Sequence, residues 1–344
     1  MKAAILKKFN DDLAIENISD PDCPEDGVVL EVLACGVCRS DYHGWSGHHP
    51  KVNIGDILGH EYCGVVVAAG EKAKYKNGDR LIAPFILGCG NCTSCQTGFS
   101  NTCETQMTPG FGMQGAYAEY ISVPRDHNLV TLPDSISPKL AAGLGCRVTT
   151  AWHALTDRAN LKIGDWIAIH GIGGVGLSAV LLAKMLGAKV IAIDIVEEKL
   201  RYAEEMGADV SIDAKQEDAV AQIIEITNGG VDVSLEAMGL SQTTNASLEC
   251  LRTRGRHVHI GMPGGDGYMS INMRAIYSKQ LSFFGSRGMP TWKYPTLLEL
   301  IERGSVNLEP LVSRQINLTD ASKELKMMSG ATPPGTAAIT NFTA

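Results

Sequence analysis

Four cysteines within fifteen residues are the clearest chemical pattern in this chain of 344 residues. Their spacing is Cys-x2-Cys-x2-Cys-x7-Cys, and nearby glycines allow the backbone to turn tightly around a bound ion. Zn²⁺ accepts four thiolates tetrahedrally, and such a closed set leaves no position for a substrate. The spacing leaves little room for unstrained disulfides. We therefore predict a structural zinc site formed by Cys89, Cys92, Cys95 and Cys103.

A glycine-rich turn at residues 171–176 fits the pattern G-x-G-x-x-G. It follows an apolar run at 166–170 that predicts a strand, and it opens a predicted helix at 177–186. This context is typical of a dinucleotide-binding turn, in which the helix N-terminus offers free N–H groups to the pyrophosphate. Asp194 ends the next predicted strand, where its carboxylate would bind ribose hydroxyls and repel a 2′-phosphate. The pattern favours NAD over NADP; the alternative is a turn that binds no nucleotide.

Three further potential metal ligands lie far apart in the sequence: Cys38, His60 and Cys146. Taken singly, each has a simpler interpretation as a buried core residue. Spacing alone does not bring them together.

A resemblance to a known family connects these patterns. Cys38-Arg39-Ser40-Asp41-x-His43, Gly59-His60-Glu61, the four-cysteine cluster, Cys146 and the glycine turn with Asp194 occur in this order. The order resembles that of the zinc-containing medium-chain alcohol dehydrogenases, over essentially the whole chain.

The resemblance implies a catalytic zinc ion held by Cys38, His60 and Cys146, with water or substrate in the fourth position. Glu61 matches a residue that can reach the metal during ligand exchange. Asp41 matches a carboxylate that orients the His60 imidazole. Two thiolates and a neutral imidazole balance the charge of Zn²⁺, which still acts as a Lewis acid on a bound alcohol.

The resemblance also implies a proton path and a substrate pocket. Ser40 would take the hydroxyl proton and pass it through the nicotinamide ribose to His43, while hydride moves to NAD⁺. Phe85 and Trp45 resemble aromatic residues of the pocket; the alternative for Trp45 is a core tryptophan.

The cofactor contacts that the resemblance implies come from several segments. Thr150 and Val175 resemble residues that press on the nicotinamide ring, and Lys199 resembles a second ribose contact, although a solvated helix charge is its alternative. The full predicted set is Arg39, Thr150, Gly171, Gly173, Gly174, Val175, Gly176, Asp194 and Lys199.

The chain departs from the family pattern near its C-terminus. Many members have an arginine there that binds the pyrophosphate, whereas residues 335–339 read Gly-Thr-Ala-Ala-Ile. We therefore expect weaker phosphate anchoring, with Arg39 carrying more of it.

The elements that must position these residues change in character near residue 147. Before it, short strand-like runs (27–34, 63–70 and 79–84) alternate with Gly, Pro, Asp and Asn. After it, strands and helices alternate, which predicts a doubly wound parallel sheet. The predicted strands are 166–170, 189–194, 208–212, 231–236 and 256–260, and the predicted helices are 177–186, 197–206, 218–227 and 294–303.

We therefore predict an α/β protein with a Rossmann doubly wound parallel sheet and a β-rich GroES-like catalytic domain. The GroES-like domain would comprise residues 1–147, completed by 287–344, and the NAD-binding Rossmann domain residues 148–286. The resemblance puts the active site between the two domains.

Composition excludes several classes of protein. A net charge of −8 argues against nucleic-acid binding. The sequence has no run of 18 or more apolar residues, so we expect no membrane-spanning segment. The first residues also lack a signal-peptide pattern. We expect a cytoplasmic protein with a small-molecule alcohol or aldehyde as substrate. By resemblance to compact microbial enzymes, we expect a homo-oligomer, with a tetramer favoured over a dimer.

The predicted activity is reversible, zinc-dependent oxidation of an alcohol by NAD. A polyol dehydrogenase is one alternative, but those enzymes commonly have glutamate where Cys146 stands. Asp194 argues against an NADP-linked aldehyde reductase, and retention of all three ligands argues against a non-catalytic NAD-binding protein. The sequence does not identify the particular alcohol. We expect the loop at 48–54, which includes His48 and His49, and the loop at 107–114 to influence which alcohol is bound.

Overall fold

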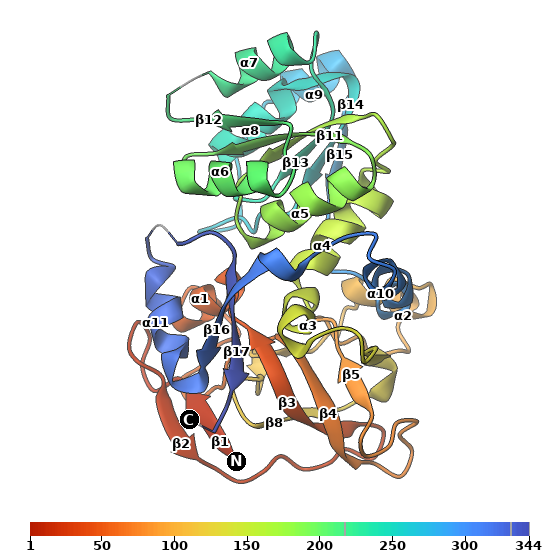
Figure 1. Cartoon of the computed structure of the whole chain (residues 1–344), viewed down its shortest axis with the longest axis vertical. Helices are drawn as coiled ribbons and strands as arrows, with labels where there is room; N and C mark the ends of the chain where they lie inside the picture. The colour runs from red at the N-terminus through yellow and green to blue at the C-terminus, as the bar shows by residue number, and fades with distance from the viewer. Residues whose placement is uncertain (217, 331, 344) are drawn as a thin grey trace. The chain divides into compact units, whose positions relative to one another are not determined.

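The computed structural model describes residues 1–216, 218–330 and 332–343, which fold into two compact units (Figure 1). One unit contains Met1–Thr149 and Gly288–Ala344, and the other contains Thr150–Arg287. The first unit is therefore built from both ends of the chain. Among the described residues, no helix combines the length and apolar character needed to cross a bilayer.

The second unit is built on a parallel six-stranded sheet, as the sequence predicts. In spatial order its strands are β12 (Val210–Asp213), β11 (Lys189–Asp194), β10 (Trp166–His170), β13 (Val231–Glu236), β14 (Leu251–His259) and β15 (Ser282–Gly285). The strand β10 comes first in sequence but lies inside the sheet, with β11 on one side and β13 on the other. The strand order reverses at β10, and in open α/β sheets such a switch point is where ligands bind.

Helices connect these strands and cover the sheet. They are α5 (Gly174–Met185), α6 (Glu197–Glu205), α7 (Ala219–Ile226), α8 (Ser241–Glu249) and α9 (Met273–Lys279). Strands β10 and β11 are nearly continuous apolar runs because helices bury both faces of a parallel sheet. Strand β13 alternates apolar and polar residues, yet all of its residues are buried. Side chains of these strands form the core of this unit, together with residues such as Leu248 and Ile223.

Two boundaries in this unit differ from the prediction by three or more residues. Helix α5 starts at Gly174 rather than 177, because the end of the glycine turn forms its first turn. Strand β14 starts at Leu251 rather than 256, since an irregular register with β13, with Arg254 at φ +62°, extends the pairing. Strand β15 was not predicted, because this four-residue edge strand is too short for a clear periodic pattern.

The first unit contains a seven-stranded sheet. The order is β16 (Val312–Asn317), β17 (Thr336–Asn341), β3 (Val28–Gly36), β4 (Glu61–Ala69), β5 (Arg80–Ile82) and β9 (Val130–Thr131), with β8 (Tyr120–Val123) paired to β3. Among the described strands of this sheet, β16 and β17 are parallel and the other pairs are antiparallel. Figure 1 shows the blue C-terminal strands beside the orange-red β3, so the end of the chain completes the sheet begun by its start. The three strands predicted in this region correspond to β3, β4 and β5.

Short helices and two small strand pairs, the first antiparallel and the second parallel, complete the first unit. The pairs are β1 (Lys2–Ile5) with β2 (Ala14–Asn17), and β6 (Thr108–Pro109) with β7 (Gly112–Met113). The helices are α1 (Arg39–Trp45), α2 (Thr93–Gln96), α3 (Pro138–Leu144), α10 (Tyr294–Glu302) and α11 (Ala321–Met327). Helix α4 (Arg147–His153) carries the chain from the first unit into the second.

Candidate metal centres and nucleotide-binding turn

The register of β3 and β4 brings two separate segments together. The two strands are antiparallel, and Gly36, the last residue of β3, pairs with Glu61, the first residue of β4. Cys38 therefore follows the end of one strand while His60 precedes the start of its neighbour. Cys38 is also the N-cap residue of α1.

Cys146 joins them because the chain after α3 passes very close to the start of β4. A Cβ atom on Gly145 would lie 2.9 Å from the Cα atom of Glu61, so this approach requires glycine. The carbonyl of Gly145 accepts a hydrogen bond from the backbone N–H of Phe85 at 3.1 Å. These contacts hold the loop that carries Cys146 against the ends of β3 and β4.

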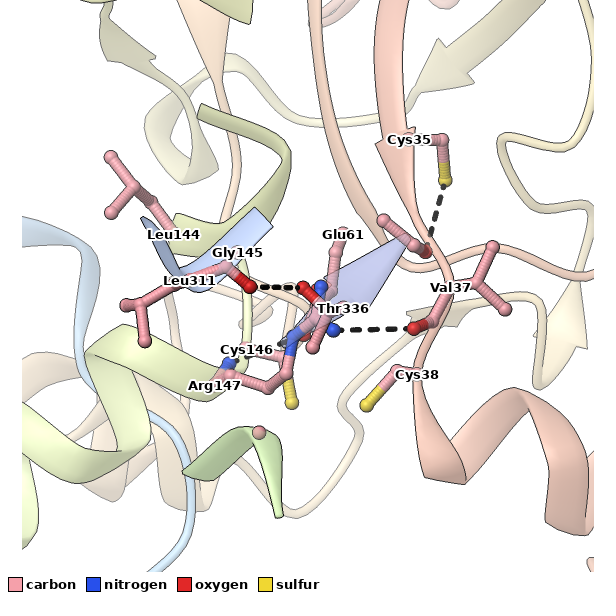
Figure 2. A network of polar contacts seen from close by, with 12 residues as sticks. Cys35, Val37, Cys38, Glu61, Leu144, Gly145, Cys146, Arg147, Leu311 and Thr336 are labelled. Carbon is pink, nitrogen blue, oxygen red and sulfur yellow. Dashed lines mark hydrogen bonds and ion pairs between the residues drawn. The ribbon is translucent and has the colours of Figure 1, made fainter. Parts of the chain in front are cut away.

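The resulting group contains Cys38, His60, Glu61 and Cys146, whose possible ligand atoms all lie within 4.8 Å of one another. All four side chains are buried. Figure 2 shows the sulfur atoms of Cys38 and Cys146 pointing into the same space. Nε2 of His60 is buried without a hydrogen-bond partner. Two thiols and a free imidazole nitrogen at this separation fit the donor set of a catalytic zinc site.

Asp41 fixes the orientation of the His60 ring. One carboxylate oxygen, Oδ1, lies 2.9 Å from Nδ1 of His60 and accepts a 3.2 Å hydrogen bond from the N–H of Gly59. The other, Oδ2, accepts from the N–H of Cys38 at 2.9 Å. Nδ1 of His60 therefore carries the proton, and the Nε2 lone pair is left for a metal ion.

The two cysteines of this group are electrostatically coupled. The hydrogen bond from Cys146 holds the pKa of Cys38 well below its usual value, and the same contact raises the pKa of Cys146. Burial lowers the pKa of His60, but the Asp41 carboxylate and the Cys38 thiolate together more than offset this and raise it well above the usual value. A divalent cation bound by these residues would displace protons from the two thiols.

Arg147 is a residue of this site that the sequence analysis did not single out. Its guanidinium forms an ion pair with the Glu61 carboxylate, and both side chains are buried. Burial raises the pKa of Glu61 to about 8, while the charge of Arg147 opposes that rise. A charged residue directly after Cys146 is the sequence signal that could have drawn attention to it.

The residues of helix α1 differ in how close they lie to the Cys38–His60–Cys146 group. Ser40 lies close to it, with its Oγ 4.0 Å from the sulfur of Cys38, and His43 is half-buried on the same helix. Arg39 donates to the backbone carbonyl of Met328 and its guanidinium lies 5.2 Å from the Tyr42 ring. Trp45 packs in the main core of the unit, and its indole N–H donates to the carbonyl of Asp11 at 2.6 Å. That position matches the core alternative weighed for Trp45.

Two aromatic rings lie beside the His60 ring. Phe85 packs against Cys38 and Cys146, and its ring centre is 5.9 Å from that of His60. Phe111, from the loop expected to influence the substrate, lies 5.3 Å from His60 and 4.5 Å from His49. The sequence analysis named Phe85 but not Phe111, because nothing in the local sequence ties residue 111 to residue 60.

The four-cysteine lobe forms a second compact group. The sulfurs of Cys89, Cys92, Cys95 and Cys103 lie within 4.8 Å of one another. Backbone N–H groups point at them: that of Cys92 donates to the sulfur of Cys89 and that of Cys89 to the sulfur of Cys103, both at 3.3 Å. All ten cysteines lie within the described residues, and each is free of a disulfide. The arrangement fits a closed four-thiolate zinc site.

In the second unit, the glycine turn joins β10 to α5 at the switch point of the sheet. Gly171 has φ +94°, and a Cβ atom on Gly176 would lie 1.9 Å from the Gly171 carbonyl oxygen. Gly173 is the N-cap residue of α5, and a Cβ atom there would have no neighbour within 4 Å. The first and last glycines are thus required by the fold, while Gly173 leaves open space beside the helix N-terminus.

Asp194 lies at the end of β11, beside this turn. Its Oδ2 accepts a 2.7 Å hydrogen bond from the N–H of Ile172, and its Oδ1 accepts from Ile195 at 2.7 Å and Val196 at 3.1 Å. The carboxylate is thereby fixed against the turn. Of the other residues predicted to contact a nucleotide in this unit, Thr150 is buried with an unpartnered hydroxyl, while Val175 and Lys199 are partly exposed.

Comparison with known proteins shows similarity in both parts of the chain. A model of the alcohol dehydrogenase GroES-like domain matches residues 24–134, and a model of the zinc-binding dehydrogenase domain matches residues 174–303. An alcohol dehydrogenase of Geobacillus stearothermophilus is 35% identical over 77% of this chain and 78% of its own length. A D-arabitol-phosphate dehydrogenase of Enterococcus avium is 31% identical over 93% of this chain and 92% of its own.

Solved structures agree with this similarity. The alcohol dehydrogenase TADH from Thermus sp. ATN1 superposes with a TM-score of 0.92 at 31% identity, covering 99% of this chain and 100% of that chain. A zinc-binding dehydrogenase from Sinorhizobium meliloti 1021, bound to NADP, gives a TM-score of 0.90 at 29% identity and covers 98% of each chain.

Proposed function

Because this chain belongs to the zinc-containing alcohol dehydrogenases of the medium-chain dehydrogenase/reductase superfamily, we propose that it oxidises an alcohol to an aldehyde or ketone, reversibly, with NAD as the hydride acceptor. The observation that carries this proposal is the grouping of Cys38, His60 and Cys146 with their ligand atoms within 4.8 Å. These three residues would hold the catalytic zinc ion. Bound together, zinc and NAD supply a Lewis acid for the alcohol oxygen and a ring that accepts the hydride.

The residues around the site would bind, orient and deprotonate the alcohol. Asp41 holds the His60 ring through its 2.9 Å contact with Nδ1, so the metal ligand keeps one orientation. Ser40, next to Cys38, would accept the hydroxyl proton and pass it towards His43. Burial lowers the pKa of His43, which keeps its imidazole neutral and able to take that proton near neutral pH.

The aromatic rings near His60 support an apolar alcohol as the substrate. Phe85 and Phe111 lie 5.9 and 5.3 Å from the His60 ring and would exclude water from the carbon that gives up hydride. Trp45 packs in the same buried cluster as Phe111, and we propose that it supports the wall of this pocket.

NAD rather than NADP is favoured by Asp194. Its carboxylate is fixed by three backbone N–H groups at the end of β11, where it would bind the ribose hydroxyls and repel a 2′-phosphate. We propose that the glycine turn receives the pyrophosphate, that Thr150 and Val175 contact the nicotinamide, and that Lys199 and Arg39 add contacts to the ribose and the phosphates. Because the Sinorhizobium meliloti protein binds NADP, the preference of this chain for NAD over NADP should be measured directly.

A second zinc ion would be held by Cys89, Cys92, Cys95 and Cys103. It would stabilise its lobe without touching substrate, because four thiolates leave no open position. We also expect a homo-oligomer, a tetramer rather than a dimer, which sedimentation of the purified protein tests.

A polyol dehydrogenase is the second candidate. Its support is the D-arabitol-phosphate dehydrogenase, which matches more of the chain than the Geobacillus alcohol dehydrogenase does, 93% against 77%. Against it stand Cys146, where polyol enzymes commonly have glutamate, and the aromatic rings beside His60.

An initial-rate panel tests these proposals. Primary and secondary alcohols, polyols and sugar-alcohol phosphates are compared with NAD and with NADP, and zinc content is measured in the same preparation. We expect two zinc ions per chain, NAD preference and faster turnover of simple alcohols. The variant Cys146→Ala is expected to abolish activity, while Cys23→Ala, at an exposed cysteine away from both groups, serves as the control. NADP preference, or full activity after verified loss of zinc from the three-ligand site, contradicts the proposal.

A further inference from the structure

Arg147 connects the three segments that carry Cys38, His60 and Cys146. It directly follows Cys146, its Nη1 donates to the carbonyl of Val37 at 3.2 Å, and its Nη2 pairs with Oε2 of Glu61 (Figure 2). Val37 precedes one ligand and Glu61 follows another. One guanidinium therefore touches the neighbours of all three ligands.

Both oxygens of Glu61 are held by the same residue. Oε2 accepts from the Arg147 guanidinium, while Oε1 accepts from the backbone N–H of Arg147 at 3.2 Å. Gly36 leaves room for this ion pair. A Cβ atom on Gly36 would lie 2.5 Å from Oε2 of Glu61 and 2.6 Å from Nη2 of Arg147. A glycine at the end of β3 thus leaves the space that the ion pair fills.

The position of Glu61 makes this pairing consequential. A carboxylate oxygen of Glu61 lies within 4.8 Å of the ligand atoms of Cys38, His60 and Cys146. A zinc ion held by three protein ligands has one open position, which a nearby carboxylate is chemically able to fill. The Glu61 side chain is fully buried, so its ionised form needs a cation within the protein to balance the charge.

We propose that Arg147 is a positioning residue that holds the Glu61 carboxylate away from the metal and so keeps the fourth coordination position open for the substrate. The inference rests on the metal site assigned above. Without the guanidinium, Glu61 would be a buried, unpaired carboxylate beside a divalent cation. It would then move onto the metal and close the site.

The test uses the full-length protein loaded with Co²⁺, whose visible absorption reports the ligands around each metal ion, so changes on adding a probe are assigned to the site with an open position. Imidazole serves as a small neutral probe of the open position; the four-thiolate site has none and does not respond. The variants are Arg147→Met, which keeps the aliphatic stem and the backbone N–H, Arg147→Lys, and the double variant Arg147→Met with Glu61→Gln. Arg314→Met is the matched control, since it removes another ion pair of the first unit, Arg314–Glu324 at 3.0 Å.

We expect Arg147→Met to change the Co²⁺ spectrum before any probe is added and to weaken imidazole binding about tenfold or more, in the range typical for partners of metal ligands. Adding Glu61→Gln removes the competing carboxylate and should return imidazole binding to within about threefold of the unmodified protein. Arg147→Lys should fall between these limits, and Arg314→Met should match the unmodified protein. Only a competing Glu61 predicts rescue by the second substitution.

Unchanged imidazole binding in Arg147→Met would overturn the inference. So would a weakening that Glu61→Gln does not reverse, because that result assigns Arg147 to packing alone. If Arg147→Met does not fold, Arg147→Lys decides: a normal spectrum and normal imidazole binding refute the role. Failure of the unmodified protein to take up Co²⁺ at the three-ligand site instead contradicts the proposed function, so the two failures are distinguishable.

Discussion

Two buried histidines in the second unit should make that unit sensitive to acid. His170 ends β10 and His257 lies in β14, and their side chains are 2% and 0% exposed. Nδ1 of His257 lies 3.1 Å from the hydroxyls of both Ser234 and Ser247. Burial lowers the pKa of His170 to about 4 and that of His257, which also faces His259, to about 3.

The sign of the effect follows from proton linkage. Unfolded histidine has a pKa of about 6.5, so below that pH the unfolded unit binds protons that the folded unit excludes. The free energy of unfolding therefore falls as the pH drops from about 6.5 towards the folded pKa values. Each pH unit costs about 1.4 kcal/mol per histidine. Because the unfolded ring is already half protonated at pH 6.5, acidification from pH 6.5 to 5.0 should cost about 1.6 kcal/mol for each residue, or about 3 kcal/mol for the pair.

Hydrogen exchange measured by mass spectrometry tests this locally. Peptides from β10 and β14 report the opening free energy of the second unit, separately from protonation of metal ligands in the first. The variant His257→Asn keeps an amide near Ser234 and Ser247 but removes the titrating ring. After correction for intrinsic exchange, its loss of stability between pH 6.5 and 5.0 should be smaller than that of the unmodified protein by about 1.6 kcal/mol. Equal losses in the two proteins would refute the reasoning.

Further predictions concern the cofactor and the metal sites. Asp194→Gly removes the fixed carboxylate at the end of β11, so the ratio of kcat/KM for NAD to that for NADP should fall at least about tenfold; an unchanged ratio contradicts the assignment. Arg39→Ala should raise the KM for NAD more than about twofold because the family's C-terminal arginine is absent at residues 335–339, and a smaller change counts against that anchoring role. Asp41→Asn weakens the hold on His60 and should lower zinc affinity about 10- to 100-fold in a chelator competition; equal affinity would show that the carboxylate does not tune the ligand. Cys92→Ser should leave one zinc ion per chain and lower Tm, whereas two retained zinc ions would rule out the four-cysteine site.

The order of the chemical motifs was enough to predict the family and the fold class. The glycine turn and the four-cysteine lobe each lie within one short stretch, so local spacing alone indicates their chemistry. The alternation of strands and helices after residue 147 likewise predicted the parallel sheet, because apolar periodicity reflects which faces are buried. Edge strand β15 was not predicted because four residues show too little periodicity.

Tertiary structure alone brought together the dispersed residues. Cys38, His60 and Cys146 converge through the pairing of Gly36 with Glu61 and the close approach of Gly145 to β4, neither of which leaves a local pattern. The same is true of the Arg147–Glu61 pair, whose members are 86 residues apart, and of Phe111 beside His60. Spacing along the chain determines chemistry only where the ligands are neighbours; elsewhere strand register and close packing decide which side chains meet.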